Sequence, residues 1–456
     1  MLHVRQRKEK RIAAAAWAAW ILFAGLALFM AGAIAPSPDA SHLLAALIVP
    51  AAGLCLMGRR RRPRIPVLNY HSVSDRPDWL SLRELSLAPR LFEAQLQWLS
   101  RNGYRTLFVS EVHDLLSGRR APAPGARYVA LTFDDGYADH WVAVVPLLRK
   151  YGMKATFFVS PDFIEDGDGV RPTLDDKPSA ELEWEGYLTW PEIRAMQDAG
   201  VAEIQSHGKA HARVVTSPQI RRFVSPQTSS VWVFWNTYRT RKAAWWRAIR
   251  ADRSLWGRPV FAMGPALTHR AFLPDPRADR HLKAVVNRQG DAFFSRPEWD
   301  KRLAEHRRSY LGRHGDESRR ETGEEYAARV QKDLRSARRL IEAETGHPVR
   351  FLCWPENAST EEAERIAAAV GYDATVSNHH DTCNRIGEDA AHIGRAYVLG
   401  DDQIVRGRRL HTRAFMLKLR FLEGRILLYP AVMAIDGITK LGRRLTCRTH
   451  GSIWRS

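Results

Sequence analysis

The sequence predicts an α/β protein in which helices cover a parallel sheet, and three observations support this prediction. From Pro66 onwards, short apolar runs alternate with amphipathic stretches, as expected when parallel strands are joined by crossover helices. A chain of 456 residues has enough apolar content for one large core or two ordinary ones. The acidic and histidine motifs described below follow the ends of predicted strands, where folds of this class carry their chemistry.

The individual elements follow from local patterns of apolar, turn and capping residues. We expect strands where apolar and β-branched residues run between turn residues, at 67–73, 129–134, 155–160, 202–206, 349–354 and 374–377. We expect helices at 91–102, 139–150, 191–198 and 321–343. Pro191 is a favourable first helical residue because its fixed φ suits the first turn.

The N-terminal residues 1–64 are predicted to be a basic segment followed by a transmembrane anchor. Residues 12–35 carry no charge and exceed the ~20 residues that a spanning helix needs. A second apolar run, 42–57, is shorter. Because basic residues flank both outer ends, the positive-inside rule favours a helical hairpin at a bacterial-type inner membrane, with the catalytic domain on the cytoplasmic side. The alternative is a single span that places the domain outside.

The charge balance restricts the classes of partner. A net charge of +19 suits a polyanion or an anionic membrane surface. Nucleic acid is not expected as a partner, because no zinc-finger spacing or RNA-binding signature is present. The four cysteines show no CxxC spacing, so neither a disulfide framework nor a structural zinc site is predicted.

The hexapeptide at 132–137, TFDDGY, carries the first chemical signal. It follows the apolar run 128–131 and places Asp134 and Asp135 side by side at a strand end. Adjacent carboxylates repel each other unless a cation or a proton separates them. Metal-assisted hydrolysis uses such a pair, with one carboxylate on the metal and the other free as a base. An ordinary Asp-Gly turn is the alternative for the dipeptide alone.

With its flanks, this hexapeptide resembles the polysaccharide deacetylase family of NodB-like carbohydrate esterases. The shared stretches are TFDDG, the PLL at 146–148, the ATFFV at 155–159, and a His-x3-His pair at His207 and His211, where Gly208 replaces the usual Ser or Thr. The clear resemblance covers 66–214 and a weaker one covers 349–398. It implies a distorted (β/α)7 barrel at 65–405, with a Trp- and Arg-rich insertion at about 212–345. Residues 406–456 would form a basic tail that could lie on a membrane surface.

The resemblance also implies roles for individual residues. Asp135, His207 and His211 would bind a divalent metal, with zinc as the default and cobalt, nickel or ferrous iron as alternatives. Asp134 would be the general base. The catalytic acid is expected to be a histidine, with His392 as the first candidate and His379 and His380 as the others. The residues expected to contact substrate or line the site are Tyr137, Trp354, Glu356, Arg395 and His71.

The third motif departs from the family pattern. The third motif usually ends in Pro, an aromatic residue and Gly, whereas Glu356 and Asn357 follow Pro355 here. Asn tolerates a positive φ, so the turn could survive. Arg395 could pair with Asp134, as arginines do in related enzymes.

The function implied is hydrolytic, metal-dependent N-deacetylation of amino sugars in a cell-surface polysaccharide or its lipid-linked precursor. The expected partners are the glycan or a polyprenyl-linked saccharide, and the lipid membrane. Two alternatives remain open at this point: a deformylase of a lipid-linked amino sugar, and a retired glycan-binding protein on the same fold.

Overall fold

The computed structural model describes residues 64–76, 85–228, 233, 235–236, 242–244, 253–378, 384–387, 389–397, 408–425, 428 and 431–435. The segments 12–35 and 42–57, in which the anchor is predicted, lie outside these residues. Within the described ranges, no helix is both long and apolar enough to cross a membrane.

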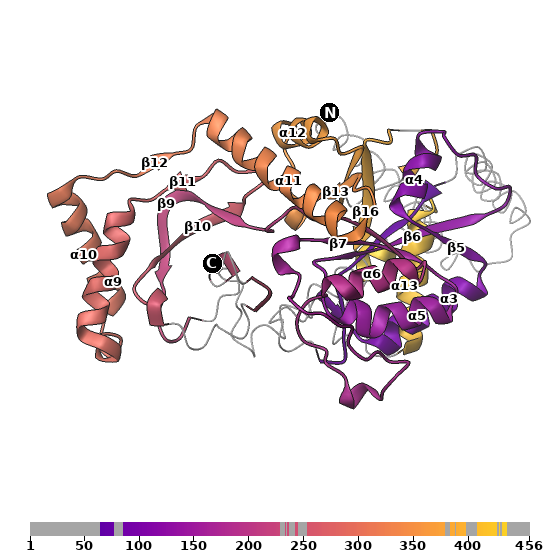
Figure 1. Cartoon of the computed structure of the whole chain (residues 1–456), viewed down its shortest axis with the longest axis horizontal. Coiled ribbons are helices and arrows are strands. Elements are labelled where there is room, and N and C mark those ends of the chain that lie inside the picture. Colours follow the sequence, from indigo (N-terminus) through magenta and orange to yellow (C-terminus); the bar gives the residue numbers. More distant parts are fainter. Residues whose placement is uncertain are drawn as a thin grey trace, which may run out of the picture.

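Parallel strands form a closed ring, which lies in the right-hand part of the molecule as drawn in Figure 1. In ring order they are β2 (Val67–Tyr70), β16 (His392–Tyr397), β14 (Ala374–Asn378), β13 (Phe351–Cys353), β8 (Ala202–Ser206), β7 (Ala155–Val159) and β6 (Arg127–Asp134). Strand β6 pairs with β2 and so closes the ring. β5 (Tyr104–Leu107) pairs with the N-terminal half of β6. The predicted parallel α/β fold is therefore confirmed.

The ring is distorted where β13 meets β8, because Leu352 and Ser206 form the single register pair between those strands. Elsewhere the strands pair over two to five residues. Strands β6 and β7 are buried almost throughout, which explains why both read as continuous apolar runs in the sequence.

Helices surround the ring. They are α3 (Pro89–Arg101), α4 (Val109–Leu116), α5 (Val145–Lys150), α6 (Trp190–Asp198), α11 (Gly323–Thr345), α12 (Glu361–Val370) and α13 (Arg408–Leu422). A π-helical turn, His140–Val144, leads into α5. Helix α6 begins with a capping box in which Thr189 and Glu192 satisfy each other's backbone N–H groups.

Short elements complete the barrel region. Strand pairs join β1 (Arg64–Ile65) to β15 (Asn384–Arg385) and β3 (Ser72–Val73) to β4 (Ser86–Leu87). Single turns of helix lie at Pro161–Phe163, Ser179–Glu181 and Pro355–Asn357, and two more, Lys242–Ala244 and Arg253–Leu255, lie in the insertion.

Two domain boundaries differ from the sequence-based ones. Helix α11 lies inside the predicted insertion, yet Val330, Leu334 and Ile341 are fully buried in the main core, so the helix belongs to the barrel wall. Helix α13 lies inside the predicted tail, yet Phe415 and Leu419 join the same core against α3. In both cases the apolar stripe of an amphipathic helix covers the barrel.

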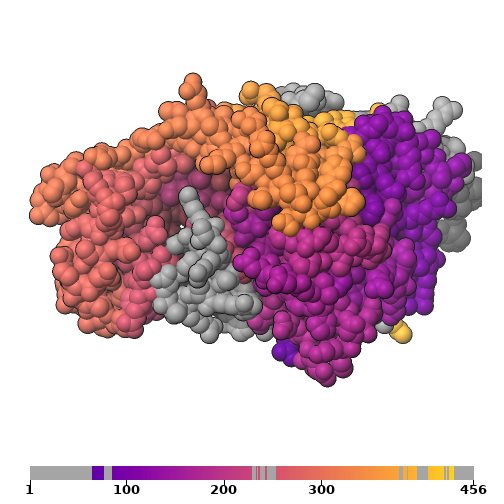
Figure 2. Space-filling model, in the orientation of Figure 1, coloured from indigo at the N-terminus to yellow at the C-terminus, as the bar shows by residue number. Residues whose placement is uncertain are grey.

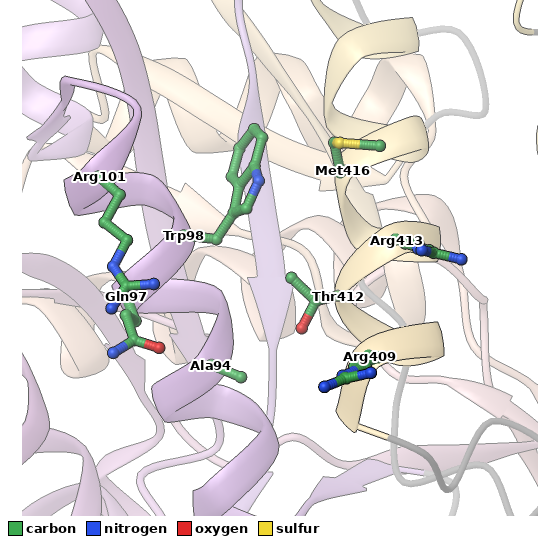
Figure 3. A pocket seen from close by; sticks show the side chains of 8 residues that line it. All are labelled: Ala94, Gln97, Trp98, Arg101, Arg409, Thr412, Arg413 and Met416. Carbon is green, nitrogen blue, oxygen red and sulfur yellow. The ribbon is translucent and has the colours of Figure 1, made fainter.

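Helices α3 and α13 leave a groove between them, and Figure 3 shows the side chains that line it. The lining residues are Ala94, Gln97, Trp98, Arg101, Arg409, Thr412, Arg413 and Met416. Trp98 makes an edge contact with Phe415 at a centroid distance of 6.1 Å, which fixes α13 against the barrel.

The rest of the insertion forms an arm that extends away from the barrel (Figure 1). We define the arm as residues 213–228 and 253–320. It contains the antiparallel pair β9 (Arg213–Phe223) and β10 (Pro259–Pro265), the pair β11 (Phe272–Leu273) and β12 (Arg319–Arg320), α9 (Pro276–Gln289), a single turn at Gly290–Phe293 and α10 (Trp299–His314). A small core of its own stabilises it, formed by Phe223, Leu282, Val285, Val286, Phe293, Phe294 and Leu303.

Candidate active site

The two adjacent aspartates diverge at the C-terminal end of β6. Asp134 is the last residue of the strand, whereas Asp135 has a φ of 71° and Gly136 a φ of 73°. Asp adopts this left-handed conformation more readily than most residues, and Gly adopts it without cost. The sharp turn directs the two carboxylates to different partners, although they are neighbours in the sequence.

Asp135 lies with two histidines in a group that could hold a metal ion. Its Oδ1 is 3.4 Å from His207 Nε2 and 3.7 Å from His211 Nε2, and all three residues are buried. His207 Nδ1 lies 2.9 Å from the Cys353 carbonyl oxygen and donates to it, which leaves Nε2 for a ligand. Two imidazoles and one carboxylate fit zinc and similar divalent ions and leave coordination positions open. The structure thus brings the three predicted ligands together.

Protonation of these ligands gives a testable pH dependence. Burial, assisted by the Asp134 carboxylate, raises the pKa of Asp135 to about 6, although His71 acts against it. Burial also lowers the pKa of His207 to about 3, so His207 is neutral near pH 7.

We therefore expect metal affinity to fall as the pH decreases through about 6, because protons compete for Asp135. Cobalt titrations of metal-free protein from pH 5 to 7.5, followed by visible absorption, measure this. The slope should approach ~1 log unit of affinity per pH unit on the acid side. An affinity that is constant down to pH 5 would contradict the assignment of Asp135 as a ligand.

Asp134 is paired with an arginine, although one of its carboxylate oxygens also lies within 4.8 Å of a His207 ring nitrogen. Arg395 NH1 lies 2.7 Å from Asp134 Oδ1, and Arg395 NH2 lies 2.5 Å from Oδ2, so the pair is bidentate. Burial by itself would raise the pKa of Asp134, but the charge and hydrogen bonds of Arg395, together with His207 and His71, outweigh burial, and the pKa lies well below the usual range. Asp134 is therefore ionised at neutral pH, as a general base must be.

His71 completes this part of the site. It follows β2, and its Nε2 lies 3.8 Å from Asp134 Oδ2. Burial lowers the pKa of His71, while the Asp134 carboxylate acts in the opposite direction. A neutral imidazole beside an ionised carboxylate is placed to exchange a proton with it.

The loop between the two histidine ligands is braced from α11. Gly208 has a φ of 73°, and a Cβ there would lie 3.4 Å from Asp333 Oδ1 and 3.3 Å from a methyl group of Leu267. Asp333 instead approaches the loop and accepts a hydrogen bond from the Lys209 backbone N–H at 2.8 Å. The positive φ at Gly208 explains why glycine suits this position, where Ser or Thr is usual.

Replacing Asp333 with Ala should weaken metal binding and lower the free energy of unfolding by about 1–3 kcal/mol, because a loop N–H loses its acceptor. Asp333→Asn is the matched control, since its amide oxygen can still accept the bond. Urea unfolding and zinc affinity of the two variants give the comparison. Equal zinc affinity in Asp333→Ala and the parent would show that the brace is dispensable.

The insertion also reaches this loop. The Trp235 ring lies 5.0 Å from the His211 ring, and Lys242 Nζ donates to the Ala210 carbonyl oxygen. Both side chains are buried, and Trp235 also packs edge-on against Phe163 at 4.8 Å. Part of the Trp-rich stretch therefore supports the second histidine ligand.

Other predicted site residues have different positions from those expected. Tyr137 is 2% exposed and donates from its hydroxyl to Asp135 Oδ2 at 2.9 Å, so it orients a ligand. The Trp354 side chain is fully buried in the main core. Glu356 has a φ of 55° and lies at the site rim, with Oε1 3.3 Å from Arg213 Nε.

The structure does not place His392 in the site. It begins β16, whereas Arg395 further along that strand contacts Asp134. The His392 side chain is 43% exposed and pairs with Asp389 at 3.1 Å and Glu364 at 3.5 Å. Those contacts, the bond to Glu364 foremost, raise its pKa. The prediction that His392 is the acid is therefore wrong, because a residue at the N-terminal end of a barrel strand lies opposite the catalytic face. His379 and His380 lie outside the described residues.

Cys353 is a site residue that the sequence analysis missed. Its Sγ lies 3.8 Å and 3.9 Å from the two Asp134 carboxylate oxygens, and its carbonyl orients His207. Burial raises the pKa of the thiol well above its usual value. Its position at the end of β13, just before the third motif, is the sequence signal that could have identified it.

Comparison with known proteins gives a consistent picture. A family model described as polysaccharide deacetylase matches residues 121–248. YxkH of Bacillus subtilis, a candidate polysaccharide deacetylase, is 41% identical over 96 residues, which are 21% of this chain and 32% of that protein. The poly-β-1,6-N-acetyl-D-glucosamine N-deacetylase of Escherichia coli is 24% identical over 140 residues, which are 31% of this chain and 20% of that protein. The chain thus spans a third or less of the length of these relatives.

Among solved structures, a de-N-acetylase from Aggregatibacter actinomycetemcomitans aligns with a TM-score of 0.45 and 19% identity, over 74% of this chain and 95% of that one. The family match includes the aspartate pair and both histidine ligands. The chain therefore contains a domain of the polysaccharide deacetylase family.

Proposed function

We propose that the protein is a metal-dependent hydrolase that removes N-acetyl groups from amino sugars of a surface polysaccharide or its lipid-linked precursor. One observation carries this proposal above the others. Asp135 groups with two histidines, while its neighbour Asp134 is held by Arg395 outside that group. The geometry therefore supports one carboxylate as a ligand and the other as a free base.

The residues would divide the work as follows. A bound divalent ion would polarise the acyl carbonyl and lower the pKa of a water molecule. Asp134 would accept a proton from the attacking water, and Arg395 would keep Asp134 in position. The new C–O bond forms as the C–N bond breaks, and the leaving nitrogen takes a proton. His71 is placed to relay to that nitrogen the proton that Asp134 takes from the water, because its Nε2 lies 3.8 Å from Asp134 Oδ2.

This division of roles predicts unequal effects for two histidines. His71→Asn should lower kcat for deacetylation by roughly 100-fold or more, as expected for loss of a proton donor. His392→Asn, on the exposed side, should leave kcat within about twofold. Steady-state kinetics of both variants, with metal content measured, gives the result. A larger loss in His392→Asn than in His71→Asn would restore His392 as the acid.

The proposed reaction is tested by acyl release from a panel of substrates. The metal-loaded full chain would be incubated with N-acetylglucosamine oligomers, poly-N-acetylglucosamine and polyprenyl-linked N-acetylated saccharides. Acetate release supports the deacetylase, and formate release from formylated analogues supports the deformylase alternative. Glycan binding without release of either acid, in metal-loaded protein, supports the retired glycan-binding protein.

Localisation belongs to the same proposal. The uncharged segment 12–35 and its basic flanks support an inner-membrane protein with its domain on the cytoplasmic side. Reporter fusions at the C-terminus discriminate between the two topologies. Fluorescence of a GFP fusion supports the cytoplasmic side, and activity of an alkaline phosphatase fusion supports the outer side.

A further inference from the structure

The arm concentrates the positive charge of the protein. Its 84 residues contain 18 Lys and Arg and eight Asp and Glu, a net charge of +10, compared with +19 for all 456 residues. Less than a fifth of the chain therefore carries about half of its net charge. Figure 2 shows the arm as a lobe at one end of the molecule, where its helices are open to solvent.

Four of the eight acidic side chains of the arm form ion pairs with basic side chains of the arm itself. Asp275 pairs with Arg277, and Asp291 pairs with Arg253. By contrast, Arg288 on α9 and Arg313 on α10 are exposed and have no acidic partner among the described residues. Their charge is therefore available to a ligand.

These arginines belong to a basic cluster along the α9–α10 pair. Burial lowers the pKa of His281, and the nearby basic side chains of His306, Arg288, Arg313 and His314 lower it further. Tyr310 stacks on His281 at 4.6 Å and lies 4.5 Å from the His314 ring. The cluster thus combines cationic groups with flat rings, which suits an anionic polymer of sugar rings.

We propose that this outer face of α9 and α10 binds an anionic glycan and delivers it to the candidate active site. The inference rests on the proposed function for the class of ligand. Strand β9 begins two residues after His211, and its first residue, Arg213, pairs with Glu356 at the site rim. Its 11 residues span roughly 35 Å at about 3.3 Å per residue. One extended polymer can therefore contact both places.

A glycan fits this face better than a membrane does. Surfaces that lie in a bilayer interface present large apolar side chains beside the basic ones. Among the described residues, the exposed large hydrophobic side chains are Val170, Leu273, Leu340, Leu410 and Met433, and none belongs to α9 or α10.

The test is equilibrium binding of fluorescein-labelled hyaluronan, an anionic N-acetylated glycan, to the full chain in detergent. We expect Arg288→Glu combined with Arg313→Glu to weaken binding at least ~10-fold, and high salt to weaken binding of the parent protein. The control is Arg90→Glu with Arg105→Glu, two exposed arginines on the barrel with the same change in charge. It should stay within about twofold of the parent.

Three outcomes would overturn the proposal. They are no hyaluronan binding by the parent, equal losses in the arm and control variants, and a selective loss of binding to phosphatidylglycerol vesicles while hyaluronan binding persists. Acetate release from a neutral N-acetylglucosamine trimer is measured alongside and should be unchanged in the arm variant, because a trimer is too short to reach the arm. If the parent releases no acetate from any substrate, the proposed function fails, while the binding result stands independently.

Discussion

Replacing Asp134 with Asn is expected to lower acetate release by about 100- to 10,000-fold while the metal stays bound. The amide cannot accept the proton of the attacking water, yet it is the same size as the carboxylate. The metal group, Asp135 with His207 and His211, does not include Asp134, so metal content should be unchanged. Single-turnover acetate release and metal analysis on the same preparation measure both quantities.

The matched variant is Asp135→Asn, made in the neighbouring residue. It should lose metal affinity first and activity as a consequence, and added metal should restore part of its activity. Comparison of the two variants therefore distinguishes the general base from the metal ligand. Loss of metal from Asp134→Asn, with metal retained in Asp135→Asn, would reverse the assignment.

Replacing Arg395 with Met is expected to have the largest effect on stability, a loss of about 3–5 kcal/mol in the free energy of unfolding. Arg395 and Asp134 side chains are 1% and 2% exposed, so removal of the guanidinium leaves a buried carboxylate unpaired. Urea denaturation of the parent and the variant measures the change. The double variant Arg395→Met with Asp134→Asn should recover most of the loss, because no buried charge remains.

The same pair predicts how the effect of Arg395→Met changes with pH. In the parent, the lowered pKa of Asp134 contributes stability that is present above the pKa of an unfolded Asp, about 4, and is lost as the pH falls through the folded-state pKa. In Arg395→Met, burial without the arginine raises the pKa of Asp134, and protonation relieves the penalty. The stability difference should therefore be smaller at pH 4 than at pH 7. A stability difference that is independent of pH would mean that packing, and not charge, determines how much the Arg395–Asp134 pair contributes to the free energy of unfolding.

The sequence by itself determined the fold class, and its resemblance to a known family indicated which residues could bind a metal. Buried parallel strands have continuous apolar runs in the sequence, so the local pattern alone predicts β6 and β7. The aspartate pair and the two histidines lie within short segments, and local strand ends carried them to one face. Local patterns of this kind need no knowledge of distant contacts.

Only the tertiary structure decided which distant side chains complete the site. Cys353 and Asp333 contact residues more than 100 positions away in the chain, and no local pattern encodes such contacts. His392 looked eligible as an acid because the sequence does not show which end of β16 faces the aspartates. Likewise, α11 forms part of the barrel wall because its apolar stripe packs on the main core. Which surface that stripe contacts depends on the assembled layers and not on the helix alone.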